Sequence, residues 1–437
     1  MRRRTTRREM LRRTTLGGVG FWVAGAGLTA RASSPNEKLD VAVIGLGGRG
    51  KTNLGAMGDE NVVALCDVDD DRAGGAYRRF PGAKKYRDYR RMLDEMESRI
   101  DAVVVSTPDH THFHPSMLAL MMGKHLYCEK PMAHSVWETR EMTRLAAEKK
   151  VATQLGVQRH THDNVHRVVE WIRSGVIGEV RECHSWVGDD RGMPEPAKAD
   201  GVPDHLEWDL WLGPARERPY SRAYCPYDWR FWWDFGTGET GNWGCHILDI
   251  PFWALDLRYP TRVEASGPPA DPDRTPKSMT VKFDFPARGS LPPVTLHWYH
   301  TKHGPEVLHA RGLPRKGNTL FIGSEGMLLC DFGKRELYPE SKFEDFKGPG
   351  KTIPDSPGFH EEWIRACKGD AEKPTCAFDY SGPLTEAVLL GNVAYRAGEP
   401  FDWDAENLHA SSDKAQALIR PAFRKGWEVA ELARLVG

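Results

Sequence analysis

The chain has 437 residues, of which 40% are hydrophobic and 28% charged, and its formal net charge is −1. Residues 1–32 carry eight arginines and one glutamate, so the remainder has a net charge of −8. A negative charge of this size argues against nucleic acid and anionic membranes as partners. A chain of this length is expected to form two domains with large cores.

The N-terminus has the pattern of an export signal. Thr6 to Arg12 reads TRREMLR, a twin-arginine sequence, and residues 14–30 are uncharged and rich in glycine. Ala30-Arg31-Ala32 is a small-x-small cleavage site, so the mature chain is expected to begin near Ser33. The apolar run is too short and too poor in leucine for a transmembrane anchor. We therefore expect residues 1–32 to direct twin-arginine export, to the periplasm or a similar compartment, of a protein that is soluble after cleavage.

Residues 38–157 alternate between short apolar strands and helices. The predicted strands are Asp40–Ile44, Val62–Cys66, Ala102–Ser106, His125–Cys128 and Val151–Val157. Predicted helices include Met117–Met122 and Trp137–Lys149, and Ser135 with Glu138 forms a capping box before the second. Short apolar strands separated by helices indicate a parallel sheet covered on both faces. We therefore predict an α/β fold with a doubly wound Rossmann domain over residues 33–157.

The first predicted strand ends in VAVIGLGGRG, where Gly45, Gly47 and Gly50 fit G-x-G-x-x-G. Between a strand and a helix, this pattern lets the backbone turn tightly and approach a pyrophosphate. Asp67 ends the next strand, 22 residues after Gly45, where a carboxylate accepts hydrogen bonds from an adenosine ribose. Because that carboxylate repels a 2′-phosphate, NAD is predicted rather than NADP.

Residues 158–437 follow a different pattern. A helix over 162–178 and a strand at Glu179–Val187 precede a long loop, from Gly188 to about Thr240, that is rich in aromatic residues. Loops of this length are usually functional, and nine of the fifteen tryptophans lie between residues 171 and 253, as suits a pocket that stacks on sugar rings. Later strands are predicted at Met279–Phe285, Val294–His300, Thr319–Ile322 and Met327–Cys330, followed by helices at His360–Lys368 and Leu384–Ala397. Strands in succession indicate a largely antiparallel sheet in a second, α+β domain.

Several short motifs carry a family resemblance. Ser106-Thr107-Pro108, Gly123-Lys124-His125, Glu129-Lys130-Pro131 and GTGETGNWGCHILD at 236–249 resemble the Gfo/Idh/MocA family of glucose–fructose oxidoreductase and inositol dehydrogenase. The resemblance implies an NAD-dependent oxidoreductase that acts on a carbohydrate. It also implies an open sheet that shelters the active site with one face and often forms an oligomer contact with the other, so a homo-oligomer, a dimer or tetramer, is expected.

The resemblance assigns roles to individual residues. It places Lys130 beside the nicotinamide, usually followed by a cis peptide bond to Pro131, and matches His246 and Asp249 to the family pattern of histidine and aspartate. Asn242 stands where the family has an earlier aspartate. An asparagine hydrogen-bonds and orients but does not take a proton, so the proton transfer falls on His246 and Lys130. A purely structural His246, paired with Asp249 on one helix face, is the alternative.

The glycine motif and the resemblance together predict two sets of binding residues besides catalytic Lys130 and His246. The predicted cofactor-binding residues are Gly45, Gly47, Gly48, Arg49, Gly50, Asp67, Ser106, Thr107, Pro108, His110, His112, Glu129, Lys130 and Gln158. The predicted substrate-binding residues are Gln158, His160, Arg230, Trp233, Asn242 and Asp249. His110, His112 and His114 also alternate as zinc ligands on a strand would, but no fourth ligand is visible, and no metal is expected.

Three functions remain open. The first is hydride transfer from a sugar or cyclitol hydroxyl to NAD. The second is a glycosidase or epimerase that works through a transient keto-sugar and then returns the hydride. The third is binding of NAD and carbohydrate without turnover, which Asn242 keeps open. Export to a compartment without an NAD pool favours a tightly held cofactor and a cycle that restores its oxidation state, because twin-arginine routes carry proteins already folded around cofactors.

Overall fold

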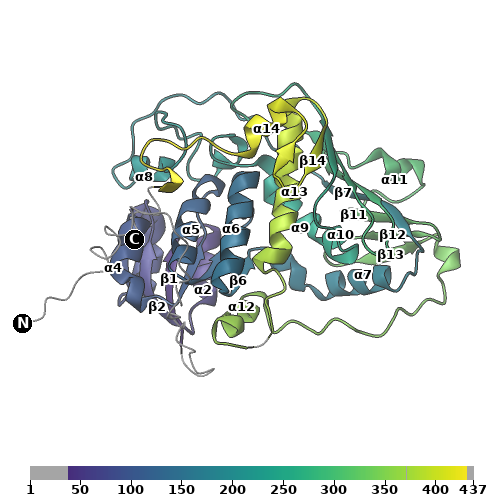
Figure 1. Ribbon diagram of the computed structural model, residues 1–437, viewed down its shortest axis with the longest axis horizontal. Helices are drawn as coiled ribbons and strands as arrows, with labels where there is room; N and C mark the ends of the chain where they lie inside the picture. The colour runs from purple at the N-terminus through teal and green to yellow at the C-terminus, as the bar shows by residue number, and fades with distance from the viewer. Residues whose placement is uncertain (1–37, 371, 431–437) are drawn as a thin grey trace, which may run out of the picture.

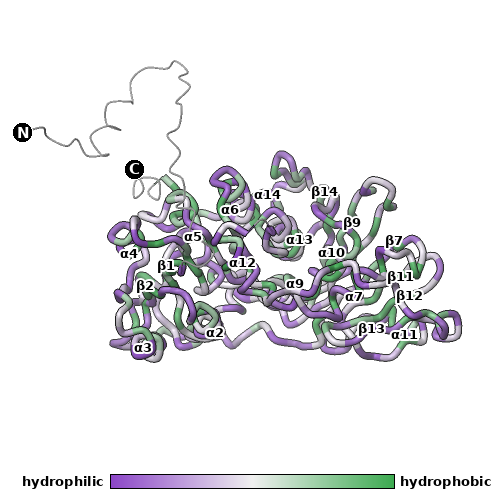
Figure 2. The backbone as a smooth tube through the Cα atoms, turned by 90° about the horizontal axis from the view of Figure 1, so that it is seen from below, coloured by the Kyte–Doolittle hydropathy of each residue, from purple (hydrophilic) through white to green (hydrophobic). Residues whose placement is uncertain are grey.

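The computed structural model describes residues 38–370 and 372–430, which form two sheets lying side by side with helices between them (Figure 1). The expected signal peptide, residues 1–32, lies outside the described residues. Within the described part of the chain, no helix is long and apolar enough to cross a membrane. In Figure 2, hydrophobic positions gather in interior strands and helices, whereas hydrophilic positions follow the outer loops.

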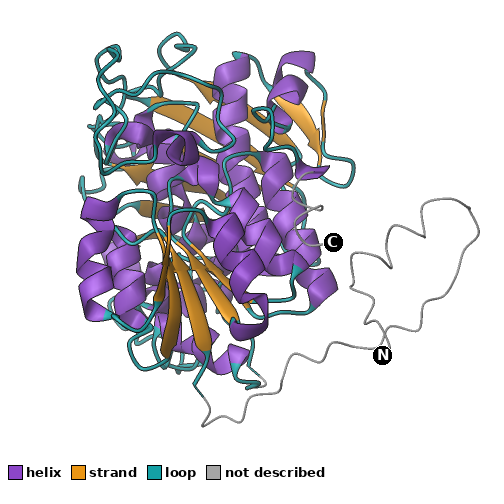
Figure 3. Ribbon diagram, turned by 90° about the vertical axis from the view of Figure 1, so that its left-hand side faces the viewer, coloured by secondary structure: helices purple, strands orange, loops and turns teal. Residues whose placement is uncertain are grey.

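The first sheet is parallel throughout and has six strands in the order β3-β2-β1-β4-β5-β6. Its strands are β1 (Asp40–Ile44), β2 (Asn61–Cys66), β3 (Lys84–Tyr86), β4 (Ala102–Val105), β5 (His125–Cys128) and β6 (Thr153–Leu155). Helices α2 (Arg49–Ala56), α3 (Asp70–Arg79), α4 (Tyr89–Met96), α5 (Phe113–Met121) and α6 (Val136–Lys149) connect them and cover both faces (Figure 3). The predicted doubly wound sheet is confirmed. Strand β3 was not predicted, because its residues Lys-Lys-Tyr carry no apolar signal.

Helix α6 begins as its capping box predicts. The Ser135 hydroxyl accepts a hydrogen bond from the Glu138 backbone N–H, and the Glu138 carboxylate accepts one from the Ser135 backbone N–H at 2.8 Å. These reciprocal bonds satisfy two N–H groups that a helix start otherwise leaves free. The helix therefore starts immediately after β5 and its following loop, which carries Lys130.

The second sheet has nine strands in the order β13-β12-β11-β7-β10-β9-β8-β14-β15. Its strands are β7 (Val180–Val187), β8 (Arg262–Ser266), β9 (Met279–Phe285), β10 (Val294–His300), β11 (Thr319–Gly323), β12 (Met327–Cys330), β13 (Arg335–Tyr338), β14 (Phe401–Asp404) and β15 (His409–Ala410). All neighbours are antiparallel except β7 and β10. Along β9 and β10 every second residue is buried, so one face of the sheet packs on the interior.

The remaining helices connect the two sheets or pack on this one, most of them on its inner face. They are α7 (Asp163–Arg173), α8 (Trp208–Leu212), α9 (Gly238–Ile247), α10 (Asp249–Ala254), α11 (Glu306–Ala310), α12 (Phe359–Cys367), α13 (Phe378–Ala397) and α14 (Asp413–Ile419). Helix α11 packs on the outer face, where Leu308 clusters with Trp186 and Leu320. In Figure 1, α9 and α13 stand between the two sheets, and α11 lies at the far edge of the second. This placement brings α9, with the GTGETGNWGCHILD motif, against the first domain.

Helix α13 starts six residues earlier than the predicted Leu384, and Pro383 lies within it. A proline inside a helix removes one N–H and leaves the carbonyl four residues earlier without its partner. That carbonyl belongs to Asp379, and it accepts a hydrogen bond from Arg258 Nη2 at 3.2 Å. The tertiary contact lets the helix continue through Pro383, the residue directly before the predicted start at Leu384.

A buried ion pair joins α13 to the first domain. Arg140, on α6, donates from Nη2 to the Glu386 carboxylate at 2.8 Å, and the Glu386 side chain is 1% exposed. Trp403 Nε1 also donates to Glu386, at 3.1 Å. Because a buried carboxylate is costly without its partner, this pair fixes how the two domains meet.

The Arg140→Leu variant is expected to lower the free energy of unfolding by about 3–5 kcal/mol, because it leaves the Glu386 charge unpaired. Arg144 lies one turn further along α6 and pairs with exposed glutamates, so Arg144→Leu should cost about 1 kcal/mol or less. Chemical denaturation of the two variants measures the difference, and adding Glu386→Gln should recover part of the Arg140→Leu loss. Equal losses in the two single variants would contradict the role assigned to the buried pair.

Candidate active site

A cavity of about 820 Å³ lies between the two domains, at the carboxyl ends of strands β1, β2, β4 and β5. A crevice at this end of a doubly wound sheet is where such folds bind ligands. The predicted residues that line it are Gly45, Gly47, Gly48, Arg49, Asp67, Ser106, Thr107, Pro108, Glu129, Lys130, Gln158, Arg230, Asn242 and His246. Arg159, Arg191, Trp229 and Trp243 also line it and were not predicted as site residues.

The glycine loop has the shape that the motif predicts. Gly45 has φ +85, and a Cβ atom there would lie 2.6 Å from the Ser106 carbonyl oxygen. Gly50 does not line the cavity, but a side chain there would overlap the Gly45 carbonyl oxygen and push α2 away from the turn. Larger residues at either position would therefore fill or displace the concave backbone that a pyrophosphate requires.

Asp67 follows directly after β2 and lies beside the glycine loop. Its carboxylate accepts hydrogen bonds from the backbone N–H groups of Leu46, at 2.7 Å, and Asp69, at 3.0 Å. Burial raises the pKa of Asp67, and these two N–H groups oppose that shift. The carboxylate is thus fixed by the backbone at the edge of the cavity, where a ribose hydroxyl would be held.

A network around Glu129 organises the floor of the cavity. Its buried carboxylate accepts from Asn53 Nδ2 at 2.9 Å and from Gln158 Nε2 at 2.7 Å. Arg49 Nε lies 3.5 Å from the same oxygen. These contacts join the glycine-loop helix, the end of β5 and the start of the second domain. They fix the backbone from which the next residue, Lys130, projects.

Lys130 crosses from the first domain to helix α9. Its Nζ donates to the backbone carbonyl of Asn242 at 2.7 Å and to Asn242 Oδ1 at 2.9 Å. Burial lowers the pKa of Lys130, and the carboxylates of Asp109 and Glu129 partly oppose that shift. The peptide bond to Pro131 is cis, as the resemblance implies. The ammonium is therefore held in the wall of the cavity by an amide rather than by a carboxylate.

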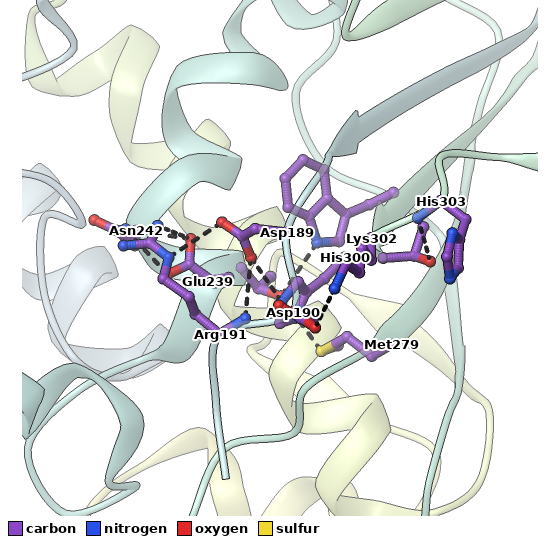
Figure 4. Close-up of polar contacts among 12 residues, drawn as sticks. Asp189, Asp190, Arg191, Glu239, Asn242, Met279, His300, Lys302 and His303 are labelled. Atoms are coloured by element: carbon purple, nitrogen blue, oxygen red, sulfur yellow. Dashed lines mark hydrogen bonds and ion pairs between the residues drawn. The ribbon is translucent and has the colours of Figure 1, made fainter. Parts of the chain in front are cut away.

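The other side of the Asn242 amide contacts an acid. Asn242 Nδ2 lies 3.3 Å from both carboxylate oxygens of Glu239, one turn earlier on α9, and Glu239 is 1% exposed (Figure 4). Arg191 Nη2 donates to Glu239 at 2.8 Å. Burial raises the pKa of Glu239, whereas Arg191 lowers it. An aspartate at 242 would put two carboxylates in contact, so the asparagine is the residue compatible with Glu239.

The chain of polar contacts continues away from the cavity. Arg191 also contacts Asp189 at 3.2 Å, and Asp189 Oδ1 accepts from His300 Nε2 at 3.1 Å (Figure 4). Asp189 and Arg191 follow β7, and His300 ends β10. The ends of two sheet strands thus support the group that orients Lys130. Sequence reasoning missed Glu239 and Arg191, and the only signal was an acid inside the glycine-rich motif.

His246 lies one turn after Asn242 on α9 and lines the same cavity. Its Nδ1 is buried and has no hydrogen-bond partner among the described residues. Burial lowers the pKa of His246 well below the usual value, and the positive charge of Lys130 lowers it further. The ring is therefore a neutral imidazole, the form that accepts a proton.

The alternative pairing of His246 with Asp249 is wrong. Helix α9 ends at Ile247 and α10 starts at Asp249, so the continuous helical spacing is lost. Asp249 instead accepts from His160 Nδ1 at 2.9 Å and from the Tyr380 hydroxyl at 2.6 Å. His160 and Asp249 are both buried outside the lining of the cavity. The prediction that His160 and Asp249 bind the substrate is therefore corrected: these two residues form a structural pair.

Three further predicted residues do not reach the cavity. Both ring nitrogens of His110 contact backbone carbonyls, those of Trp211 and Phe235. Those of His112 contact the carbonyls of Pro131, at 2.7 Å, and Thr107, at 2.8 Å. His112 thus positions two loops that line the site, rather than binding the cofactor.

Trp233 is the third. It lines a separate cavity of about 280 Å³, and its Nε1 donates to the Asp271 carbonyl at 3.1 Å. Its assignment to the substrate pocket is therefore corrected. The tryptophans that line the main cavity are Trp211, Trp229 and Trp243. In the loop after β7, tryptophans occur so close together that the sequence did not distinguish those that face the cavity from those that support it.

The site as a whole fits a dinucleotide. The turn at Gly45 leaves space over the start of α2, Asp67 is held at one end of the cavity, and Lys130 is held at the other. This arrangement defines an α/β protein with an NAD-binding crevice.

Comparison with known proteins identifies the family. The Gfo/Idh/MocA oxidoreductase model for an NAD-binding Rossmann fold matches residues 39–157, and the model for the family's C-terminal alpha/beta domain matches residues 177–289. The chain belongs to the Gfo/Idh/MocA oxidoreductase family.

Individual relatives are more distant. An inositol 2-dehydrogenase of Rubrobacter xylanophilus is 31% identical over 161 residues, 35% of this chain and 44% of that protein. A glycosyl hydrolase family 109 protein of Solibacter usitatus is 30% identical over 205 residues, 40% of this chain and 44% of that protein. The chain spans between 26% and 53% of the length of the first four curated relatives it matches.

Among solved structures, the WlbA dehydrogenase of Bordetella pertussis, in complex with NADH and UDP-GlcNAcA, has a TM-score of 0.58 to this chain. The two are 17% identical, and the match covers 84% of this chain and 99% of the other. At this identity the likeness establishes the shared fold alone.

The charge coupling between Lys130 and His246 gives a test that needs no turnover. The wild-type His246 ring should titrate below about 6.5, the ordinary histidine value. Lys130→Met should raise its pKa, because removing an adjacent positive charge favours the imidazolium. NMR titration of the histidine ring protons, with His246→Asn to assign the signal, measures both values. Lys124→Met, which removes a lysine bound to the Glu97 carbonyl outside the site, is the control. An unchanged midpoint in Lys130→Met would contradict the coupling.

Proposed function

We propose that the protein is an NAD-dependent oxidoreductase that acts on a sugar or cyclitol hydroxyl and keeps its cofactor bound through a redox-neutral cycle. The observation that carries this proposal is the Lys130 ammonium, held by Asn242 in a cavity that is continuous with the glycine loop and is also lined by the His246 imidazole. An inositol dehydrogenase among the relatives supports a polyol or sugar as substrate. The glycine loop and Asp67 are the residues that would hold NAD.

Bound NAD supplies an acceptor for the hydride of a carbinol carbon. Lys130 has N–H bonds that reach the substrate oxygen and stabilise the negative charge that develops there. His246 is a neutral imidazole that lines the same cavity, so it takes the hydroxyl proton. Asn242 takes up no proton and keeps Lys130 oriented, while Glu239, paired with Arg191, holds the Asn242 amide. In this scheme position 242 has no carboxylate, so His246 accepts the proton of the substrate hydroxyl in its place, and the hydride transfer still proceeds.

A second candidate reaction uses the same groups. Oxidation at one carbon of a glycoside makes a neighbouring C–H acidic, so elimination or epimerisation follows before the carbon is reduced again. The glycosyl hydrolase family 109 relative supports this reading. In the first reaction a second sugar, as an aldehyde or ketone, takes the hydride back, so both reactions end with NAD in its starting state, which suits the twin-arginine export expected from residues 1–32. An exported enzyme that released NADH would have nothing to restore it.

Retention of the cofactor is the first test. Protein purified without added nucleotide should carry close to one NAD per chain, measured by its absorbance spectrum and by release on denaturation. With a reactive carbohydrate it should complete many turnovers without external NAD and without NADH in solution. Chromatography of the sugar products distinguishes oxidoreduction from cleavage or epimerisation. Empty protein that binds NAD weakly and accumulates NADH in proportion to product would refute the redox-neutral cycle.

The second test concerns Lys130. The Lys130→Met variant should keep NAD bound, because the glycine loop and Asp67 are unchanged, while its turnover falls by a factor of about a hundred or more. Pre-steady-state formation of enzyme-bound NADH on mixing with substrate measures the chemical step directly. Lys124→Met serves as a matched control and should match the wild type. Unchanged turnover in Lys130→Met would remove this residue from the mechanism.

A further inference from the structure

A second cavity adjoins the active site on the side away from the glycine loop. It has a volume of about 510 Å³ and shares two wall residues, Arg159 and Trp243, with the main cavity. Its other walls come from the ends of β7 and β10, from α11 and from the residues before β11. A ligand that fills the main cavity near Lys130 therefore continues past Arg159 into this space.

The walls of the second cavity are positively charged. They contain Arg159, Lys302, Arg315 and Lys316, and no aspartate or glutamate. This is unusual in a chain whose residues after position 32 carry a net charge of −8, because clustered cations in a concave site focus the field on an anionic ligand. The net negative charge of the molecule as a whole argues against a nucleic acid as that ligand.

Two of these cations have no carboxylate partner. Within the described residues, neither Arg159 nor Arg315 forms an ion pair within 4.0 Å. The pairs formed by the lysines are exposed: Lys302 lies 3.4 Å from Asp190, and Lys316 is likewise paired at the surface. Exposed pairs of this kind are weak and exchange readily, so all four cations are available to a ligand.

Arg159 is held in place by aromatic rings. Its guanidinium carbon lies 4.4 Å from the Phe332 ring centroid and 5.5 Å from that of Trp243. Stacking on rings fixes the plane of a guanidinium and leaves the N–H groups at its edge free. Arg230 is arranged in the same way in the main cavity, 4.2 Å from the Trp229 ring. Planar, oriented guanidinium groups are suited to bidentate recognition of carboxylate and sulfate.

We propose that the second cavity is a subsite for the anionic unit of an acidic carbohydrate of two or more sugars, bearing a carboxylate or a sulfate ester. The reacting ring lies at Lys130, the exposed part of Trp243 provides an apolar face at the junction, and the next unit places its anionic group between Arg159 and Arg315. This inference rests on the proposed function, because it names the substrate class of that site. It assigns a specificity role to the loop between β10 and β11.

The test compares ligands that differ only in charge. Binding to the NAD-loaded protein is measured by calorimetry for trigalacturonate and for its fully methyl-esterified form, with a sulfated galactan trisaccharide as a separate arm. At least one acid is expected to bind about tenfold or more tightly than the neutral ester, a difference of about 1.4 kcal/mol. The affinity for that acid should fall as salt rises. Binding of trigalacturonate would show that the subsite takes a carboxylate, and binding of the sulfated trisaccharide that it takes a sulfate.

Substitutions of single arginines show which residues cause the preference for the acidic ligand. Arg315→Gln and Arg159→Gln should each reduce the preference for the acid several-fold, and Arg311→Gln, a control on the same loop outside the cavity, should leave it unchanged. Arg315 is exposed, so its substitution should not alter folding, and thermal unfolding verifies this.

Two outcomes separate this inference from the proposed function. Equal affinity for acids and ester, in a protein that oxidises neutral sugars, would overturn the subsite alone. Acid binding that depends on Arg315, in a protein that never reduces its NAD with any sugar, would support the subsite and overturn the oxidoreductase.

Discussion

The site depends on one buried cation. The Lys130 ammonium stands between the two domains, and the oxygen atoms that hold it, the backbone carbonyl and Oδ1 of Asn242, belong to helix α9 of the second domain. A buried ammonium is stable only when its donors are satisfied. The end of β5 and the start of α9 must therefore approach each other closely. The ion pair between Arg140 and Glu386 and the contacts of α13 with α6 maintain this approach.

Glu239 explains in physical terms why position 242, an aspartate in the family pattern, is an asparagine in this chain. A carboxylate lies one helical turn earlier on α9 instead, at Glu239, where Arg191 neutralises its charge. The Asn242 amide connects this carboxylate to Lys130. The Lys130 ammonium is thus held by an amide, which does not exchange a proton, and the carboxylates of Asp109 and Glu129 favour its charged form. This leaves the neutral His246 imidazole, which lines the cavity, as the remaining acceptor, while Asp249 pairs elsewhere.

The charge of the site is arranged in two parts. Around the glycine loop, acids and arginines alternate and largely pair, as at Glu129 with Arg49. Beyond Lys130 the walls are arginine and tryptophan with few acids, and Arg159 and Arg230 are held by aromatic rings. The first part suits a dinucleotide, whose ribose needs a carboxylate and whose phosphates need free N–H groups. The second suits a carbohydrate with a negative charge, for which stacked guanidinium groups provide both an apolar face and a bidentate donor.

Local patterns in the sequence determined the parallel sheet, the Gly45 turn, Asp67, the Ser135 capping box and the placement of Lys130, because each depends on neighbouring residues or on a short motif. The continuous α13 and the strand β3 were decided by tertiary structure: Arg258 satisfies a carbonyl 121 residues away, and β3 is a strand because it pairs with β2. The same holds for the site. Residues distant in the sequence come together at the site because β7, α9 and the start of the second domain converge there: Glu239, Arg191 and Arg159 join Lys130 and Asn242. Four predicted site residues turn away from the cavity because backbone carbonyls or buried partners elsewhere satisfy them: His110, His112, His160 and Asp249. A sequence specifies residue types and spacing, but the partner of a buried polar group is set by which distant segments pack against it.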